Sequence, residues 1–126
     1  MLFGLPSGKP IEEIDRALRE AAARHQFGVL TVHNLHETMR NKGVEYGGEC
    51  LVFEVCSPLH AKRALEANPA VSTALPCRIS VYRDGEGYRL ATILPSAMMQ
   101  MFGTPALDPV AAEVERDMRA IMQEAA

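Results

Sequence analysis

A tight turn between two apolar segments limits the kind of sheet that this chain can form. Residues 77–83 and 88–94 flank the run Asp84-Gly85-Glu86-Gly87. Glycines in such a run supply the backbone angles that a short β-hairpin needs, and alternating apolar segments on both sides are typical of antiparallel strands. The hairpin therefore argues against a doubly wound parallel sheet, in which helices join neighbouring strands.

Periodicity along the rest of the chain predicts an α+β fold. Apolar residues recur at helical spacing in residues 10–24, 58–67, 96–102 and 109–122, and a shorter helix is expected between a capping Asn34 and Gly43. Residues 27–33 and 50–56 are predicted strands, the second buried mainly through Leu51, Phe53 and Val55. With the hairpin, these strands predict a two-layer sandwich in which helices pack on a mainly antiparallel four-stranded sheet.

The length of the chain fits one such domain. With 126 residues it can bury a sufficient core, and neither a linker nor a repeat divides it, so residues 1–126 are expected to form a single domain with its core at about 10–124. A sheet covered on one face leaves the other face open, and Met98, Met99 and Met101 add apolar surface. Both features predict a homodimer.

Charge and hydropathy limit the partners and the location. The chain has 13 Lys and Arg against 16 Asp and Glu, without the basic excess of proteins that bind nucleic acids or membrane surfaces. The apolar segment 1–6 is too short for the core of a signal peptide. No stretch approaches the ~20 apolar residues of a membrane span. We therefore expect a cytoplasmic protein with no nucleic-acid or membrane partner.

The three cysteines, Cys50, Cys56 and Cys77, offer the most distinctive chemistry. Their odd number and the lack of Cys-x-x-Cys spacing favour free thiols over disulfides or a zinc ribbon. Cys56 lies where a strand should pass into a helix at Pro58, and the exposed N–H groups of a helix N-terminus lower the pKa of a nearby thiol. His60 could add a nitrogen ligand within one turn. The plainer alternative is that Cys56, like most cysteines, is simply buried.

Whether Cys56 and Cys77 meet depends on the path of the chain between them. The expected helix 58–67 carries the chain about 15 Å away from Cys56. Residues 68–76 could span up to ~30 Å and bring the chain back, or they could leave Cys77 at the opposite end of the sheet. The sequence is compatible with both paths.

Catalytic motifs are absent from the sequence. It contains no Walker loop, no Gly-x-Gly-x-x-Gly fingerprint and no Gly-x-Ser-x-Gly elbow. The thioethers of Met98, Met99 and Met101 are soft enough for copper, although methionines on a short helix are more typical of packing or an interface. The sequence motifs therefore do not decide whether the protein is an enzyme.

Two ordered motifs, Cys56-Ser57-Pro58 and Leu75-Pro76-Cys77, follow the segment Phe27-Gly28-Val29-Leu30-Thr31 and Lys42. Together they resemble the prokaryotic family known as domain of unknown function three-hundred-and-two, over about residues 10–124. The resemblance implies a compact α+β domain, often dimeric, without an established activity, and it marks Cys56, Pro58, Pro76 and Cys77 as functional residues. The family usually has asparagine where this chain has Ser57.

The leading hypothesis is a small cytoplasmic homodimer that binds a soft transition-metal ion or a thiol-reactive small ligand. Its site would comprise Cys56, Pro58, His60, Pro76 and Cys77, with Cys56, Cys77 and His60 as the metal ligands. One alternative is a thiol redox or sulfur-transfer enzyme with Cys56 as nucleophile and Cys77 as resolving thiol. The other is an interaction domain with structural cysteines. A binding protein would hold metal without turnover, whereas the enzyme would show a reversible disulfide.

Overall fold

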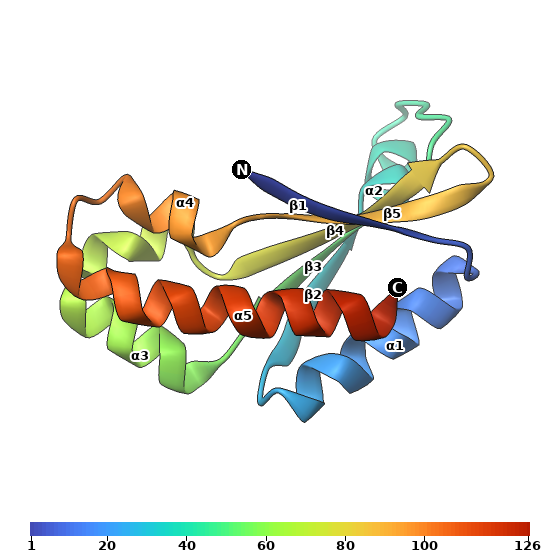
Figure 1. Ribbon diagram of the computed structural model, residues 1–126. Helices are drawn as coiled ribbons and strands as arrows, with labels where there is room; N and C mark the ends of the chain where they lie inside the picture. The colour runs from blue at the N-terminus through green and yellow to red at the C-terminus, as the bar shows by residue number, and fades with distance from the viewer.

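The computed structural model describes residues 1–126 and consists of helices packed on an antiparallel sheet of five strands (Figure 1). The strands are β1 (Leu2–Ser7), β2 (Gly28–Asn34), β3 (Cys50–Cys56), β4 (Cys77–Asp84) and β5 (Gly87–Ile93). They lie in the order β1-β5-β4-β3-β2, and every neighbouring pair is antiparallel. The α+β class and the 84–87 hairpin are therefore confirmed.

Strand β1 corrects the prediction of four strands. It pairs with β5, with Leu2 opposite Ile93 and Ser7 opposite Tyr88. The sequence hides this strand because Leu2–Ser7 contains Gly4 and Pro6, residue types that are depleted in strands. Proline is tolerated at Pro6 because β1 forms an edge of the sheet.

The helices begin where local sequence signals place them. They are α1 (Ile11–Arg24), α2 (Leu35–Asn41), α3 (Pro58–Ala67), α4 (Pro95–Gln100) and α5 (Asp108–Ala125), with short 3-10 turns at Pro69–Ala74 and Pro105–Leu107. Asn34 caps α2 as expected, because its Oδ1 accepts the Glu37 N–H at 3.0 Å. Gly43 follows α2 with a φ of +78°, a conformation that favours glycine.

The core lies between one face of the sheet and helices α1, α3 and α5, which all cover the same side (Figure 1). Phe53 and Val55 of β3 are 0% and 2% exposed, as their alternation predicts. Leu51, which we also expected to be buried, is only half-buried, although it packs against the edge of the core. The opposite face of the sheet is not covered by any helix of this group.

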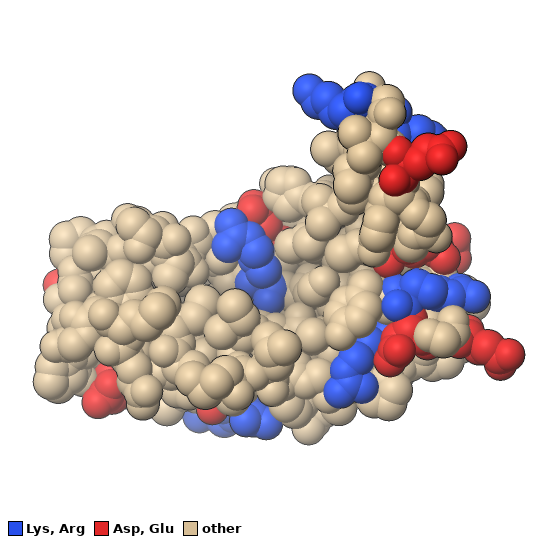
Figure 2. Space-filling model, turned by 90° about the horizontal axis from the view of Figure 1, so that it is seen from above, with Lys and Arg blue, Asp and Glu red and all other residues tan.

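That open face carries apolar side chains at one end. Leu2 and Ile93, paired across β1 and β5, are 70% and 50% exposed. Figure 2 views the molecule from this side: charged side chains gather toward the end that carries α2, the surface over α4 is largely uncharged, and basic and acidic side chains also lie on the sheet between them. No helix of the structure combines the length and the apolar character that crossing a membrane requires.

Candidate functional site

The sheet brings Cys56 and Cys77 to the same end of two adjacent strands. Cys56 is the last residue of β3, and Cys77 is the first residue of β4. The antiparallel register places Val55 opposite Cys77, so Cys56 lies one residue from the pairing position. Of the two paths open to the chain, it takes the one that returns: α3 leads away from Cys56, and residues 68–76 lead back.

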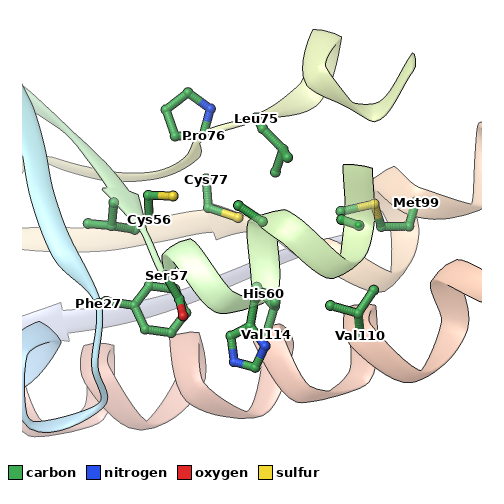
Figure 3. A pocket seen from close by; sticks show the side chains of 13 residues that line it. Phe27, Cys56, Ser57, His60, Leu75, Pro76, Cys77, Met99, Val110 and Val114 are labelled. Atoms are coloured by element: carbon green, nitrogen blue, oxygen red, sulfur yellow. The ribbon is translucent and has the colours of Figure 1, made fainter. Parts of the chain in front are cut away.

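A small apolar pocket opens beside the two cysteines (Figure 3). It lies between the ends of β3 and β4 and the helices α3, α4 and α5, and its interior leaves about 20 Å³ for the centre of a water-sized sphere. A site needs about this much room to hold one water molecule. The pocket is lined by Phe27, Val55, Cys56, Ser57, His60, Ala61, Ala64, Leu75, Pro76, Cys77, Met99, Val110 and Val114.

Burial dominates the ionisation of both thiols. Cys77 is 6% exposed, and its burial raises the pKa to about 11, with a further increase from the Cys56 thiol and an opposing effect from Arg78. Burial also raises the pKa of Cys56. This differs from our expectation of an acidic Cys56: the residue does precede the N-terminus of α3, but the loss of hydration on burial raises the pKa of its thiol. Both thiols are therefore protonated at neutral pH.

His60 lines the pocket but interacts with another part of the protein. Its Nε2 lies 3.2 Å from Asp117 Oδ2, and its ring centroid lies 5.9 Å from that of Phe27. Figure 3 shows the imidazole directed toward α5, away from the thiols. Nowhere in the structure do three side chains of His, Cys, Asp or Glu gather in a way that could hold a metal ion. His60 therefore does not join Cys56 and Cys77 in the three-ligand set that we expected.

The other predicted site residues have distinct positions. Pro58 occupies the first turn of α3 and does not line the pocket, so its role is to start the helix. Pro76 lines the pocket directly before Cys77, in a cis peptide bond with Leu75. Ser57 is 7% exposed and lines the pocket without forming a side-chain hydrogen bond that caps α3.

Several pocket residues were not predicted as part of a site. Phe27, Val110 and Val114 come from segments far from the cysteines in sequence: Phe27 directly precedes β2, and the packing of α5 against the core brings Val110 and Val114 there. Met99 is 3% exposed and contributes a third sulfur atom to the lining. The sequence signal for Met99 was its place in a methionine-rich helix, which favoured packing or an interface.

Cys50 lies at the opposite end of β3 from the pocket. Its half-buried Sγ is 3.8 Å from Ser80 Oγ, and no other cysteine is near it. Cys50 is not among the residues that line the pocket. It therefore provides a matched comparison for the two thiols of the site.

Comparison with known proteins places the chain in a family. A crystal structure of an uncharacterised DUF302 protein from Bacillus stearothermophilus is similar in fold, with a TM-score of 0.95 and 26% sequence identity over 99% of this chain and 98% of that one. The comparison with curated proteins finds no match. The model of the family described as "Domain of unknown function DUF302" matches residues 3–125. This match spans nearly the whole sequence, and the chain therefore belongs to the DUF302 family.

Proposed function

We propose that this domain binds a soft metal ion through the thiols of Cys56 and Cys77, as a homodimer in a reducing compartment. The observation that carries the proposal is that two free cysteines, at the ends of adjacent strands, line the same pocket. This pocket leaves about 20 Å³ for the centre of a water-sized sphere. Two converging thiolates are a strong ligand pair for soft metals. The space suits a single ion, whereas a drug-sized ligand needs a pocket of ~300 Å³ or more.

The lining of the pocket favours soft over hard metals. It contains two cysteines and a methionine, but no aspartate and no glutamate. Hard ions such as magnesium and calcium require oxygen ligands, mainly carboxylates and carbonyls. Thiolates instead select copper, zinc and their heavier relatives.

The raised pKa values of both thiols weigh against a redox or sulfur-transfer enzyme. Attack on a disulfide or a sulfur donor requires a thiolate, and burial raises the pKa of Cys56 as well as that of Cys77. His60, the histidine that lines the pocket, has its imidazole directed toward Asp117 of α5 and away from the thiols (Figure 3). A soft metal does not need a preformed thiolate, because the ion displaces the thiol protons as it binds.

The homodimer is supported by the open face of the sheet. Leu2 and Ile93 form an exposed apolar pair on this face, and Met101 on the neighbouring segment is 74% exposed. Apolar surface of this kind is commonly buried between identical chains related by a two-fold axis. Sedimentation of the wild type should give twice the mass of one chain, and Leu2→Lys with Ile93→Lys should give the mass of one. A wild type that sediments as a single chain contradicts the dimer.

Metal titration of the reduced protein tests the site. We expect one Cd²⁺ or Cu⁺ per chain, detected by the ultraviolet band of a thiolate–metal bond and by elemental analysis. Cys56→Ser and Cys77→Ala should each abolish the band, whereas Cys50→Ser should retain it. Circular dichroism verifies that each variant is folded.

Two outcomes contradict the proposal. One is a wild type that binds no soft metal. The other is a Cys50→Ser variant that loses metal as completely as Cys56→Ser, because Cys50 lies at the far end of β3. If the reduced protein instead forms a reversible Cys56–Cys77 disulfide and retains no metal, the redox alternative replaces the binding function.

A further inference from the structure

The sheet places Cys56 and Cys77 at the separation of a pair that a disulfide can join. The register puts Val55 opposite Cys77, so Cys56 is offset from Cys77 by one residue across β3 and β4. A spacing of about 4.8 Å between strands and a rise of about 3.3 Å per residue then put the two Cα atoms about 6 Å apart. Disulfides usually join residues whose Cα atoms lie ~4.4–6.8 Å apart. The separation of Cys56 and Cys77 therefore suits a disulfide.

Both side chains also face the same space. Strict alternation would turn Cys56 away from Cys77, but β3 ends at Cys56, and both residues line one pocket. Figure 3 shows the two side chains next to each other, with their thiols directed toward the same side of the pocket. The Cys56 thiol is close enough to contribute to the raised pKa of Cys77. The direction of the two thiols therefore agrees with the separation of their Cα atoms.

From this geometry, and resting on the proposed function, we propose that hydrogen peroxide closes a reversible disulfide between Cys56 and Cys77 and thereby switches off metal binding. The same two sulfur atoms either bind the metal or bond to each other, so the two states exclude one another. No group of three His, Cys, Asp or Glu side chains elsewhere in the structure could hold the metal instead. The redox state of the pair therefore decides whether the domain holds its ion.

The surroundings of the thiols set the order of the reaction. Cys56 is half-buried, whereas Cys77 is 6% exposed, so the oxidant meets Cys56 first. The pocket has room for little more than one water-sized molecule, which favours hydrogen peroxide over a bulky disulfide as the oxidant. Because burial raises the pKa of both thiols, few of them are ionised at neutral pH and the reaction is slow. Slow closure suits a switch that responds to sustained oxidation and does not suit an enzyme.

The reaction has two steps. In the first, the Cys56 thiolate attacks one oxygen of the peroxide, the O–O bond breaks, and the leaving hydroxide takes up a proton to give water and a sulfenic acid on Cys56. In the second, Cys77 loses its proton, its sulfur attacks the Cys56 sulfur, and the displaced hydroxide leaves as a second water. The two thiols lose two electrons and two protons, and one peroxide becomes two waters. Two molecules of a small thiol reverse the change and are themselves joined in a disulfide.

Thiol counting before and after peroxide treatment tests the switch. The reduced, metal-free protein has three free cysteines, and we expect hydrogen peroxide to remove the two thiols of the pocket. Peptide mass mapping should find Cys56 joined to Cys77 within one chain and Cys50 still reduced. The oxidised protein should lose the ultraviolet band of bound Cd²⁺, and dithiothreitol should restore it.

Two variants and one metal-loaded sample separate this reaction from unspecific oxidation. Cys50→Ser should form the disulfide as the wild type does, because Cys50 lies at the far end of β3. Cys77→Ala should stop at a sulfenic acid on Cys56, which dimedone traps. Wild type loaded with Cd²⁺ should oxidise more slowly than the metal-free protein, because both sulfur atoms are occupied. Circular dichroism verifies that each variant is folded.

Three results overturn the inference while the reduced protein still binds Cd²⁺, and they leave the proposed function standing. In the first, Cys56 and Cys77 of the treated wild type stay unlinked. In the second, the disulfide involves Cys50 or joins two chains. In the third, the protein with the Cys56–Cys77 disulfide binds Cd²⁺ as well as the reduced protein does. If the disulfide forms but the reduced protein binds no soft metal, both proposals fail and the redox alternative replaces them.

Discussion

Strand β3 has a cysteine at each end, and the two ends differ in what surrounds the thiol. Alternation along the strand would put both side chains on the open face, because Cys50 and Cys56 are an even number of positions apart. Cys50 follows this rule and contacts Ser80. Cys56 lines the pocket instead, because β3 ends there and the chain turns into α3. The neighbours supplied by distant segments, and not the residue type, distinguish the two ends.

The largest effect should come from breaking the core that holds both ends in place. Phe53 lies midway along β3 and is 0% exposed, so Phe53→Ala should lower the free energy of unfolding by about 3–5 kcal/mol. Val52, half-buried on the opposite face, is the control, and Val52→Ala should cost distinctly less. Urea denaturation followed by circular dichroism measures both. An unchanged midpoint for Phe53→Ala would contradict the central position of the strand.

Alkylation rates should show how strongly the native pocket protects a thiol that is exposed in the unfolded chain. Burial raises the pKa of Cys77 to about 11 from an ordinary 9.0. Its thiolate fraction at neutral pH should therefore be lower by about 100-fold than in the unfolded chain, and labelling should slow at least as much. Peptide mass mapping after iodoacetamide treatment, with and without urea, reports each cysteine separately. Native Cys77 that reacts as fast as Cys56 would show that the pocket does not protect it.

The same burial predicts a pH dependence of stability. The pKa of Cys77 is about 11 in the folded protein and 9.0 ordinarily, so between these values the thiol ionises in the unfolded chain but not in the folded one. The free energy of unfolding is therefore unaffected by this thiol below about pH 9 and falls as the pH rises toward 11. At about pH 10.5 this loss should reach about 2 kcal/mol. Other groups also titrate there, so the wild type is compared with Cys77→Val, which lacks this contribution. Identical pH profiles of the two in urea denaturation would contradict the assigned burial.

The sequence predicts the parts of this molecule that local chemistry determines. The 84–87 hairpin, the Asn34 cap and the strand-to-helix transition at Pro58 all depend on neighbouring residues, and all three are confirmed. Strand β1 was missed because its pairing with β5 is a long-range contact, which the glycine and proline in Leu2–Ser7 do not suggest.

The candidate site was less accessible to sequence reasoning. Both cysteine motifs were recognised, but their convergence depends on the antiparallel register of β3 and β4. The expected acidity of Cys56 considered only the helix that follows it, whereas burial by distant segments raises its pKa. For the same reason His60 was expected at the metal, although Asp117 of α5 binds its imidazole instead.

The smallest effect concerns that His60–Asp117 pair, which tests whether His60 belongs to the site. The pair joins α3 to α5, and both side chains are 17% exposed. Asp117→Asn retains the shape but removes the charge, which should cost about 1 kcal/mol of stability in urea denaturation. Glu113→Gln is the matched control: Glu113 pairs with Arg63 across the same two helices at 38% and 41% exposure, where an ion pair contributes about 0.5 kcal/mol.

The metal affinity of Asp117→Asn shows whether His60 is a structural residue or a metal ligand. If His60 only supports the packing of α3 on α5, Asp117→Asn should bind Cd²⁺ or Cu⁺ as tightly as the wild type, because the two thiols are untouched. If the imidazole coordinates the metal, removal of its carboxylate partner should weaken binding about 10- to 100-fold, as observed for outer partners of metal-bound histidines. A loss of that size would therefore bring His60 into the site and add a nitrogen ligand to the two thiols.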